Sequence, residues 1–193
     1  MKKSNERADK TMSTIYPIQI DQHTREQLKQ LAQKDFSSGL NCAESIFRAF
    51  VQAELIDAPL SFNRFVCGFG GGGGSAGYSC GALCGGIALL GGAFGKEREN
   101  PYQIDGVDER RAHMRDFTQR IVNNFANEFA RLNGSALCRE ICDIHHGYNS
   151  PERKDFCQSI LLPNTTELLC NYLEMSQEAL RAMPYGQNVA GYR

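Results

Sequence analysis

Apolar residues recur at three- and four-residue spacing along most of the chain, and strict alternation of polar and apolar residues is almost absent. This spacing is that of an α-helix with one buried face. It predicts helices over residues 23–36 and 41–55. The second begins with Asn41 and Glu44 in the spacing of a capping box, in which each side chain binds a free backbone N–H group.

A helix over residues 79–94 has apolar or glycine residues on every side, which predicts burial at the centre of the fold. The longest predicted helix covers 107–132 and ends at Gly134, and its apolar stripe is Met114, Phe117, Ile121, Phe125, Phe129 and Leu132. Shorter helices are predicted within 136–142, 150–163 and 164–183.

These elements predict one all-α domain over residues 21–183, a helical bundle around the buried glycine-rich helix. Residues 1–20 are expected to form a disordered or loosely packed extension, and residues 184–193 a loose tail. The chain has 193 residues, which is enough for a substantial core.

The net charge of -1 gives no basic surface for nucleic acid. The N-terminus has no apolar segment typical of a signal peptide, so we expect a cytoplasmic protein. The apolar helix has about 16 residues, fewer than the roughly 20 that cross a bilayer, and we expect no membrane insertion.

Residues 67–95 contain thirteen of the nineteen glycines and three of the eight cysteines. A phosphate-binding loop is not favoured, because no strand precedes the glycines and no Gly-Lys-Ser/Thr follows them. Free N–H groups at Gly72, Gly73, Gly74 and Gly81 could instead bind anionic sulfur or oxygen of a cofactor. The alternative is a tight helix crossing with a flexible loop and no ligand.

Several cysteines occupy predicted helix starts. Cys42 and Cys80 directly follow the expected caps Asn41 and Ser79, and Cys138 lies three residues after Ser135. Cys157 lies two residues after a possible cap at Asp155, unless Ser150 begins that helix. The positive end of a helix stabilises a thiolate, so these positions predict lowered pKa values. In a reducing compartment such thiols favour metal binding or redox chemistry over structural disulfides.

Cys84 and Cys142 each follow another cysteine by four residues and would share its helix face, which makes both of them additional candidate ligands. Cys67 and Cys170 lack such a context, and we expect them to be core residues. His145 and His146 follow Cys142 closely, but we expect loop or surface roles for them, and His113 is expected on the flank of the long helix.

The ordered motifs "NCAES", "FGGGGG…SCGALCGG" and "NGSALCREIC", followed by a cysteine before the final helix, resemble a family of redox-active proteins with a C…CGAxxG…C…C signature. The resemblance covers about residues 27–173 and implies four signature cysteines, which map to Cys42, Cys80, Cys138 and Cys157. It also implies association with oxidoreductase and transport systems. The chain is similar as well to the non-haem domain of a split-Soret type cytochrome, for which an iron–sulfur site has been proposed.

Three functions follow as hypotheses. The first is an iron–sulfur protein for electron transfer or redox sensing, with the four signature cysteines as ligands. The second is a thiol–disulfide redox protein in which a low-pKa Cys80 or Cys138 attacks. The third is a zinc-stabilised structural or partner-binding module. A protein redox partner is expected. A homodimer is a further expectation, because an exposed cofactor edge and close-packing glycines would both suit a symmetric contact.

Overall fold

The computed structural model describes residues 16–95, 108, 111–112 and 114–193. The described chain is an all-α fold without β-strands, which confirms the predicted class. Its longer helices are α1 (Gln22–Ser37), α2 (Cys42–Gln52), α5 (Gly81–Phe94), α7 (Gln119–Asn133) and α10 (Leu162–Glu174). Its shorter elements are η1 (Leu60–Phe62), α3 (Asn63–Val66), η2 (Cys67–Phe69), α4 (Gly70–Gly73), η3 (Met114–Thr118), α8 (Cys138–Ile144), α9 (Pro151–Phe156), η4 (Cys157–Leu161) and α11 (Gln177–Ala182).

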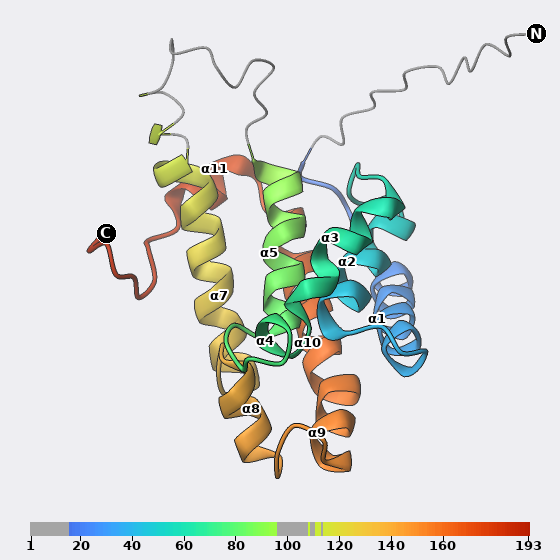
Figure 1. The fold of residues 1–193 in the computed structure, drawn as a ribbon. Helices are drawn as coiled ribbons and strands as arrows, with labels where there is room; N and C mark the ends of the chain where they lie inside the picture. The colour runs from blue at the N-terminus through green and yellow to red at the C-terminus, as the bar shows by residue number, and fades with distance from the viewer. Residues whose placement is uncertain (1–15, 96–107, 109–110, 113) are drawn as a thin grey trace, which may run out of the picture.

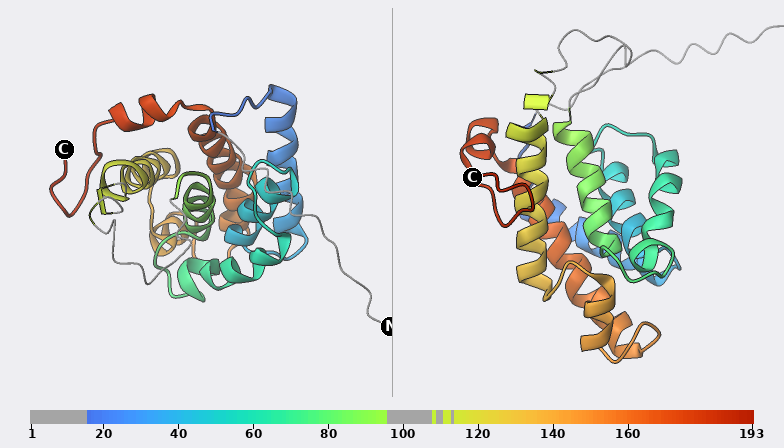
Figure 2. Two further views of the ribbon diagram at one scale, coloured as in Figure 1. Left: turned by 90° about the horizontal axis from the view of Figure 1, so that it is seen from above. Right: turned by 60° about the vertical axis from the view of Figure 1, so that its left-hand side comes forward.

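The glycine-rich helix α5 lies at the centre of the bundle, with α2, α7 and α10 packed around it (Figures 1 and 2). Its glycines permit this close packing. A Cβ atom on Gly86 would stand 2.6 Å from the ring of Phe125 in α7, closer than real carbon atoms approach. The prediction of a buried apolar helix at the centre is therefore confirmed.

The apolar stripe of the long helix forms much of the remaining core. Ile121, Phe125 and Phe129 are fully buried, whereas Leu132 at the end of the stripe is exposed. Gly134 ends α7 in the left-handed conformation, as the sequence predicts. Before α7 the backbone forms the π-helical turn η3, and parts of the predicted helix over 107–113, including His113, lie outside the described residues.

Residues 16–20 pack against the bundle, which differs from the loosely packed extension expected there. Tyr16 is buried and its hydroxyl donates a hydrogen bond to the Leu55 carbonyl. The N–H group of Ile18 donates to the carbonyl of Leu173 in α10. These contacts hold the start of the described chain on the turn that follows α2 and on α10.

The C-terminal segment is also held by specific contacts, in place of the expected loose tail. Asn124 of α7 donates a hydrogen bond to the Pro184 carbonyl, and Asn123 donates to that of Gln187. The guanidinium of Arg120 lies over the ring of Tyr185. Within the described residues, no helix is both long and apolar enough to cross a membrane.

Candidate functional site: a cavity lined by five cysteines

The crossing of α2 and α5 places Cys42 beside the start of α5. Asn41 caps α2 through a complete capping box with Glu44, as predicted, and Cys42 is the first residue of the helix. A Cβ atom on Gly81 would lie 3.5 Å from the Cβ of Cys42, so the backbone after Cys80 runs directly past Cys42. Cys80 is itself the N-cap residue of α5, one position later than the cap expected at Ser79.

A short β-bridge joins the start of α8 to the start of α5. Ser79 pairs with Leu137, and the N–H group of Cys80 donates a 2.8 Å hydrogen bond to the Ala136 carbonyl. In return, the N–H group of Cys138 donates to the Tyr78 carbonyl at 2.7 Å. The bridge fixes Cys138, the first residue of α8, close to Cys80.

Cys157 reaches the same region from the C-terminal end of α9. Ser150 caps α9, so Cys157 follows the last residue of that helix and does not lie in its first turn; the prediction of a helix start at Cys157 is wrong. Cys157 begins the π-helical turn η4. The side chain of Gln33 in α1 donates a hydrogen bond to the Gln158 carbonyl and so ties this turn to α1.

These segments enclose one cavity of about 410 Å³. Five of the eight cysteines line it: Cys42, Cys80, Cys138, Cys142 and Cys157. The remaining lining includes the cations Arg153 and Lys154 and contains no acidic side chain. Distant parts of the chain thus bring thiols and positive charge together around one space. Two of the segments that contribute to it, α8 and α9, lie together at one end of the bundle (Figure 1).

Burial is the main cause of raised pKa values in most of these thiols. It raises the pKa of Cys80 to about 12, although the N–H groups of Ala82 and Leu83 favour its thiolate. Burial and the neighbouring Cys142, whose sulfur is 3.9 Å away, raise the pKa of Cys138 to about 12. The pKa of Cys42 is raised well above its usual range by its hydrogen bond to Cys157 and by burial. The lowered values predicted at these three helix starts are therefore wrong for the free thiols.

Cys157 behaves in the opposite way. Hydrogen bonding from Cys42 lowers the pKa of Cys157 to about 7, and the charge of Arg153 acts in the same direction against the effect of burial. Cys157 is only 4% exposed. The cavity therefore contains one thiol that ionises near neutral pH among others that stay protonated.

The other predicted site residues are dispersed. Gly81 lines the cavity, and so does Gly71, whereas Gly72, Gly73 and Gly74 are not among its lining residues. The N–H group of Gly74 donates to the Gly68 carbonyl within the loop. A cofactor contact of these glycines stays a prediction.

The three cysteines outside the cavity occupy different surroundings. Cys84 is half-buried with its sulfur 3.9 Å from the Ser79 carbonyl, and Cys170 is fully buried, as expected for a core residue. Cys67 is exposed, so its predicted core position is wrong. His145 stacks on Phe156, and neither it nor the exposed His146 lines the cavity.

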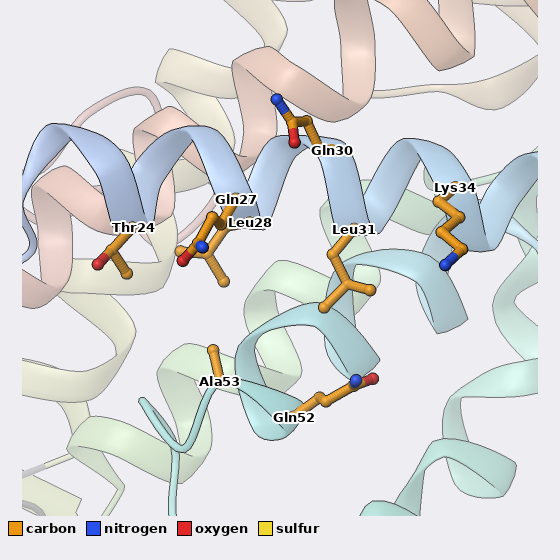
Figure 3. Close-up of a pocket in the computed structure, with 8 residues that line it drawn as sticks. All are labelled: Thr24, Gln27, Leu28, Gln30, Leu31, Lys34, Gln52 and Ala53. Atoms are coloured by element: carbon orange, nitrogen blue, oxygen red, sulfur yellow. The ribbon is translucent and has the colours of Figure 1, made fainter.

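No three His, Cys, Asp or Glu side chains in the described part of the chain are close enough together to hold a single metal ion. A second hollow, of about 370 Å³, lies between α1 and α2 (Figure 3). Its wall is formed by Thr24, Gln27, Leu28, Gln30, Leu31, Lys34, Gln52 and Ala53. It contains no thiol or carboxylate, in contrast to the cavity lined by cysteines.

Arg153 is the cavity residue that sequence reasoning missed. It is 8% exposed, and its Nε atom donates a 2.7 Å hydrogen bond to the Tyr148 carbonyl. The sequence carries a signal for it, since Arg153 precedes Cys157 by four residues, the spacing that places two side chains on one helix face.

Comparison with known families identifies the class of protein. Residues 40–182 match the family model described as "Putative redox-active protein (C_GCAxxG_C_C)", and the chain belongs to this family. The family signature places glycine before cysteine, whereas this chain has Cys80 before Gly81. Ala82 and Gly85 agree with the signature. No curated protein and no solved structure matches the chain significantly.

Proposed function

We propose that the cysteine-lined cavity binds an iron–sulfur cluster and that the protein uses it to transfer or sense electrons. Cys42, Cys80, Cys138 and Cys157 would be the ligands, and Cys142 is a fifth thiol within the same cavity. The observation that carries the proposal is the meeting of five cysteines from four separate segments around one space of about 410 Å³.

The donors and charges fit such a group. Iron–sulfur clusters are held by cysteine thiolates. Because a cluster contains several iron atoms, its ligands bind different atoms and do not need to converge on one point. Four thiolates bring negative charge, and a wall with two cations and no acidic side chain suits that charge. Bound iron would also oppose the raised thiol pKa values, because a metal lowers the pKa of its ligands.

The cluster would supply one-electron chemistry, and the protein's own residues would set its surroundings. The N–H groups of Ala82 and Leu83 are directed at Cys80 and favour its anionic form. Hydrogen bonds to the sulfurs and burial are the usual means by which a protein tunes the potential of such a site.

The test is anaerobic purification followed by visible absorption and assays of iron and acid-labile sulfide. Matched amounts of iron and sulfide in a brown protein are the expected result. A colourless protein that takes up neither iron nor sulfide on reconstitution contradicts the proposal. Zinc in place of iron would point to the structural module, which is less favoured because a zinc ion needs its ligands gathered around one point.

A thiol–disulfide function is the second candidate, favoured by the low pKa of Cys157 beside Cys42. The Cys157 thiolate would attack a small disulfide, form a mixed disulfide and release one thiolate. Cys42 would then lose its proton, attack the Cys157 sulfur and release the second thiol. One disulfide is reduced to two thiols while a Cys42–Cys157 disulfide forms.

This second candidate assigns the attacking thiol to Cys157, in place of the predicted Cys80 or Cys138. Mass spectrometry of the metal-free protein after treatment with a small disulfide tests it. A Cys42–Cys157 crosslink that forms in the wild type and not in Cys42→Ser supports the exchange. A mixed disulfide that forms only at the exposed Cys67 contradicts this exchange.

A further inference from the structure

We propose that Arg153 is the fixed counter-charge of the cysteine-lined cavity and that it raises the reduction potential of the site. The proposal rests on the proposed redox function, but it holds for a cluster and for a dithiol alike. Arg153 acts here through the sulfur atoms and is therefore a positioning residue.

The first support is the way in which the guanidinium is held. Its Nε and one terminal nitrogen both donate hydrogen bonds to the Tyr148 carbonyl, and its central carbon lies 4.5 Å from the centre of the Tyr148 ring. A side chain with 8% exposure and two attachments to one residue has little freedom to turn toward solvent. Arginine suits this position because its planar group can donate and stack together.

The glycine-rich loop makes room for Tyr148, the residue that holds Arg153. Gly71 has a φ of +63°, and a Cβ atom there would lie 2.8 Å from the Tyr148 hydroxyl. The same hydroxyl lies 3.4 Å from the Ser75 hydroxyl. The loop therefore supports Tyr148 from one side while Arg153 rests on its ring.

The second support is the set of groups that Arg153 faces. Arg153 lines the same cavity as Cys42, Cys138, Cys142 and Cys157. At these positions its positive charge favours the thiolate forms. The other cation of the wall, Lys154, is exposed and so is screened by water. No acidic side chain of the lining competes for Arg153.

The sign of the effect follows from charge balance. A cluster gains one electron on reduction. A Cys42–Cys157 disulfide gains two electrons and one proton where Cys42 is left as the thiol and Cys157 as the thiolate. The reduced form then carries the greater negative charge in both cases. A buried cation stabilises that form, and its removal makes reduction harder.

The experiment measures the midpoint potential of wild type, Arg153→Gln, Arg153→Lys and Arg139→Gln. Arg139 is a matched control, because it is exposed, rests on the ring of Tyr78 and lies outside the cavity. The expected change for Arg153→Gln is about tenfold in the equilibrium constant for reduction. This corresponds to a decrease of about 59 mV for a one-electron couple or about 30 mV for a two-electron couple.

Arg153→Lys should recover most of the potential, and Arg139→Gln should leave it unchanged. A second readout uses metal-free protein, in which alkylation of Cys157 by iodoacetamide should slow in Arg153→Gln and recover in Arg153→Lys. The alkylation rate tests the role of Arg153 separately from the proposal of a bound cluster, because it can be measured on a protein that binds no iron.

The proposal is overturned if folded Arg153→Gln keeps the wild-type potential and alkylation rate. It is equally overturned if Arg153→Lys changes both as much as Arg153→Gln, because the role is then structural and not one of charge. Circular dichroism on every variant establishes that the helices are intact.

Discussion

Gly85 of α5 lies so close to Ala43 of α2 that an added Cβ atom would stand 2.7 Å from the Ala43 carbonyl oxygen. The contact is between one helix backbone and another, so neither side can turn away. It lies one helical turn beyond Gly81, which passes Cys42 in the same crossing. The concentration of glycine beside the thiols thus has a structural cause: it lets two helix starts that carry cysteines meet.

Gly85→Ala should therefore destabilise the protein by about 1–3 kcal/mol, the range typical of added volume in a packed core. Gly91 is the matched control, because it lies in the same helix and an added Cβ atom there meets nothing within 4 Å. Gly91→Ala should stabilise the protein by about 0.4–1 kcal/mol by restricting the unfolded chain. Urea unfolding measures both, and equal effects would contradict the crossing.

The glycine loop gives a second matched pair. Gly71 and Gly73 both have positive φ values, but an added Cβ atom meets the Tyr148 hydroxyl only at Gly71, and at Gly73 it meets nothing within 4 Å. Each change to alanine should cost about 1–2 kcal/mol for the left-handed backbone. Gly71→Ala should cost more and should also change the midpoint potential, because Tyr148 holds Arg153; identical stability and potential in the two variants would contradict this relationship.

The cysteines themselves differ in expected importance. Cys80→Ala should abolish cluster binding, since Cys80 is 3% exposed and lines the cavity. Cys170→Ala should retain it, since Cys170 lies outside the cavity. Iron and sulfide content after identical anaerobic preparation decides the matter, and an equal loss in both variants would count against the ligand assignment.

Alkaline pH should destabilise the metal-free protein. Burial raises the pKa of Cys170 to about 12, and burial with the charge of Asp57 raises that of Tyr16 to about 12. The folded chain therefore keeps protons that the unfolded chain loses near its ordinary values of 9.0 and 10.0, so stability is full below pH 9.0 and falls as pH rises toward 12.

Each such group contributes a slope of about 1.4 kcal/mol per pH unit at most. Cys170→Ala should make the decline shallower, although it lowers stability at neutral pH by leaving a cavity. Denaturant unfolding at a series of pH values under reducing conditions measures the slope. A slope that is the same in wild type and variant would show that Cys170 ionises freely in the fold.

The helical class and the central helix follow from the sequence because period and composition act locally. The 3.6-residue repeat of Ile121, Phe125 and Phe129 and the uncharged segment around Gly81 need no knowledge of their partners. The capping box at Asn41 is likewise local, and the structure retains it.

The features that sequence reasoning missed depend on tertiary contacts. The helix-start rule predicts an acidic thiol at Cys80, but burial by distant segments outweighs the local N–H groups. The acidity of Cys157 comes from Cys42 and Arg153, one of them far away in the sequence. The burial of Tyr16 and the exposure of Cys67 are also set by which helices happen to cover them.

X-ray absorption at the iron edge of the anaerobically prepared protein tests the central claim most directly. Iron surrounded by sulfur, with a second iron as a near neighbour, is the predicted result, and it should be lost in Cys80→Ala. Iron bound only by nitrogen and oxygen, or a protein in which iron never binds, would contradict a cluster held by Cys42, Cys80, Cys138 and Cys157.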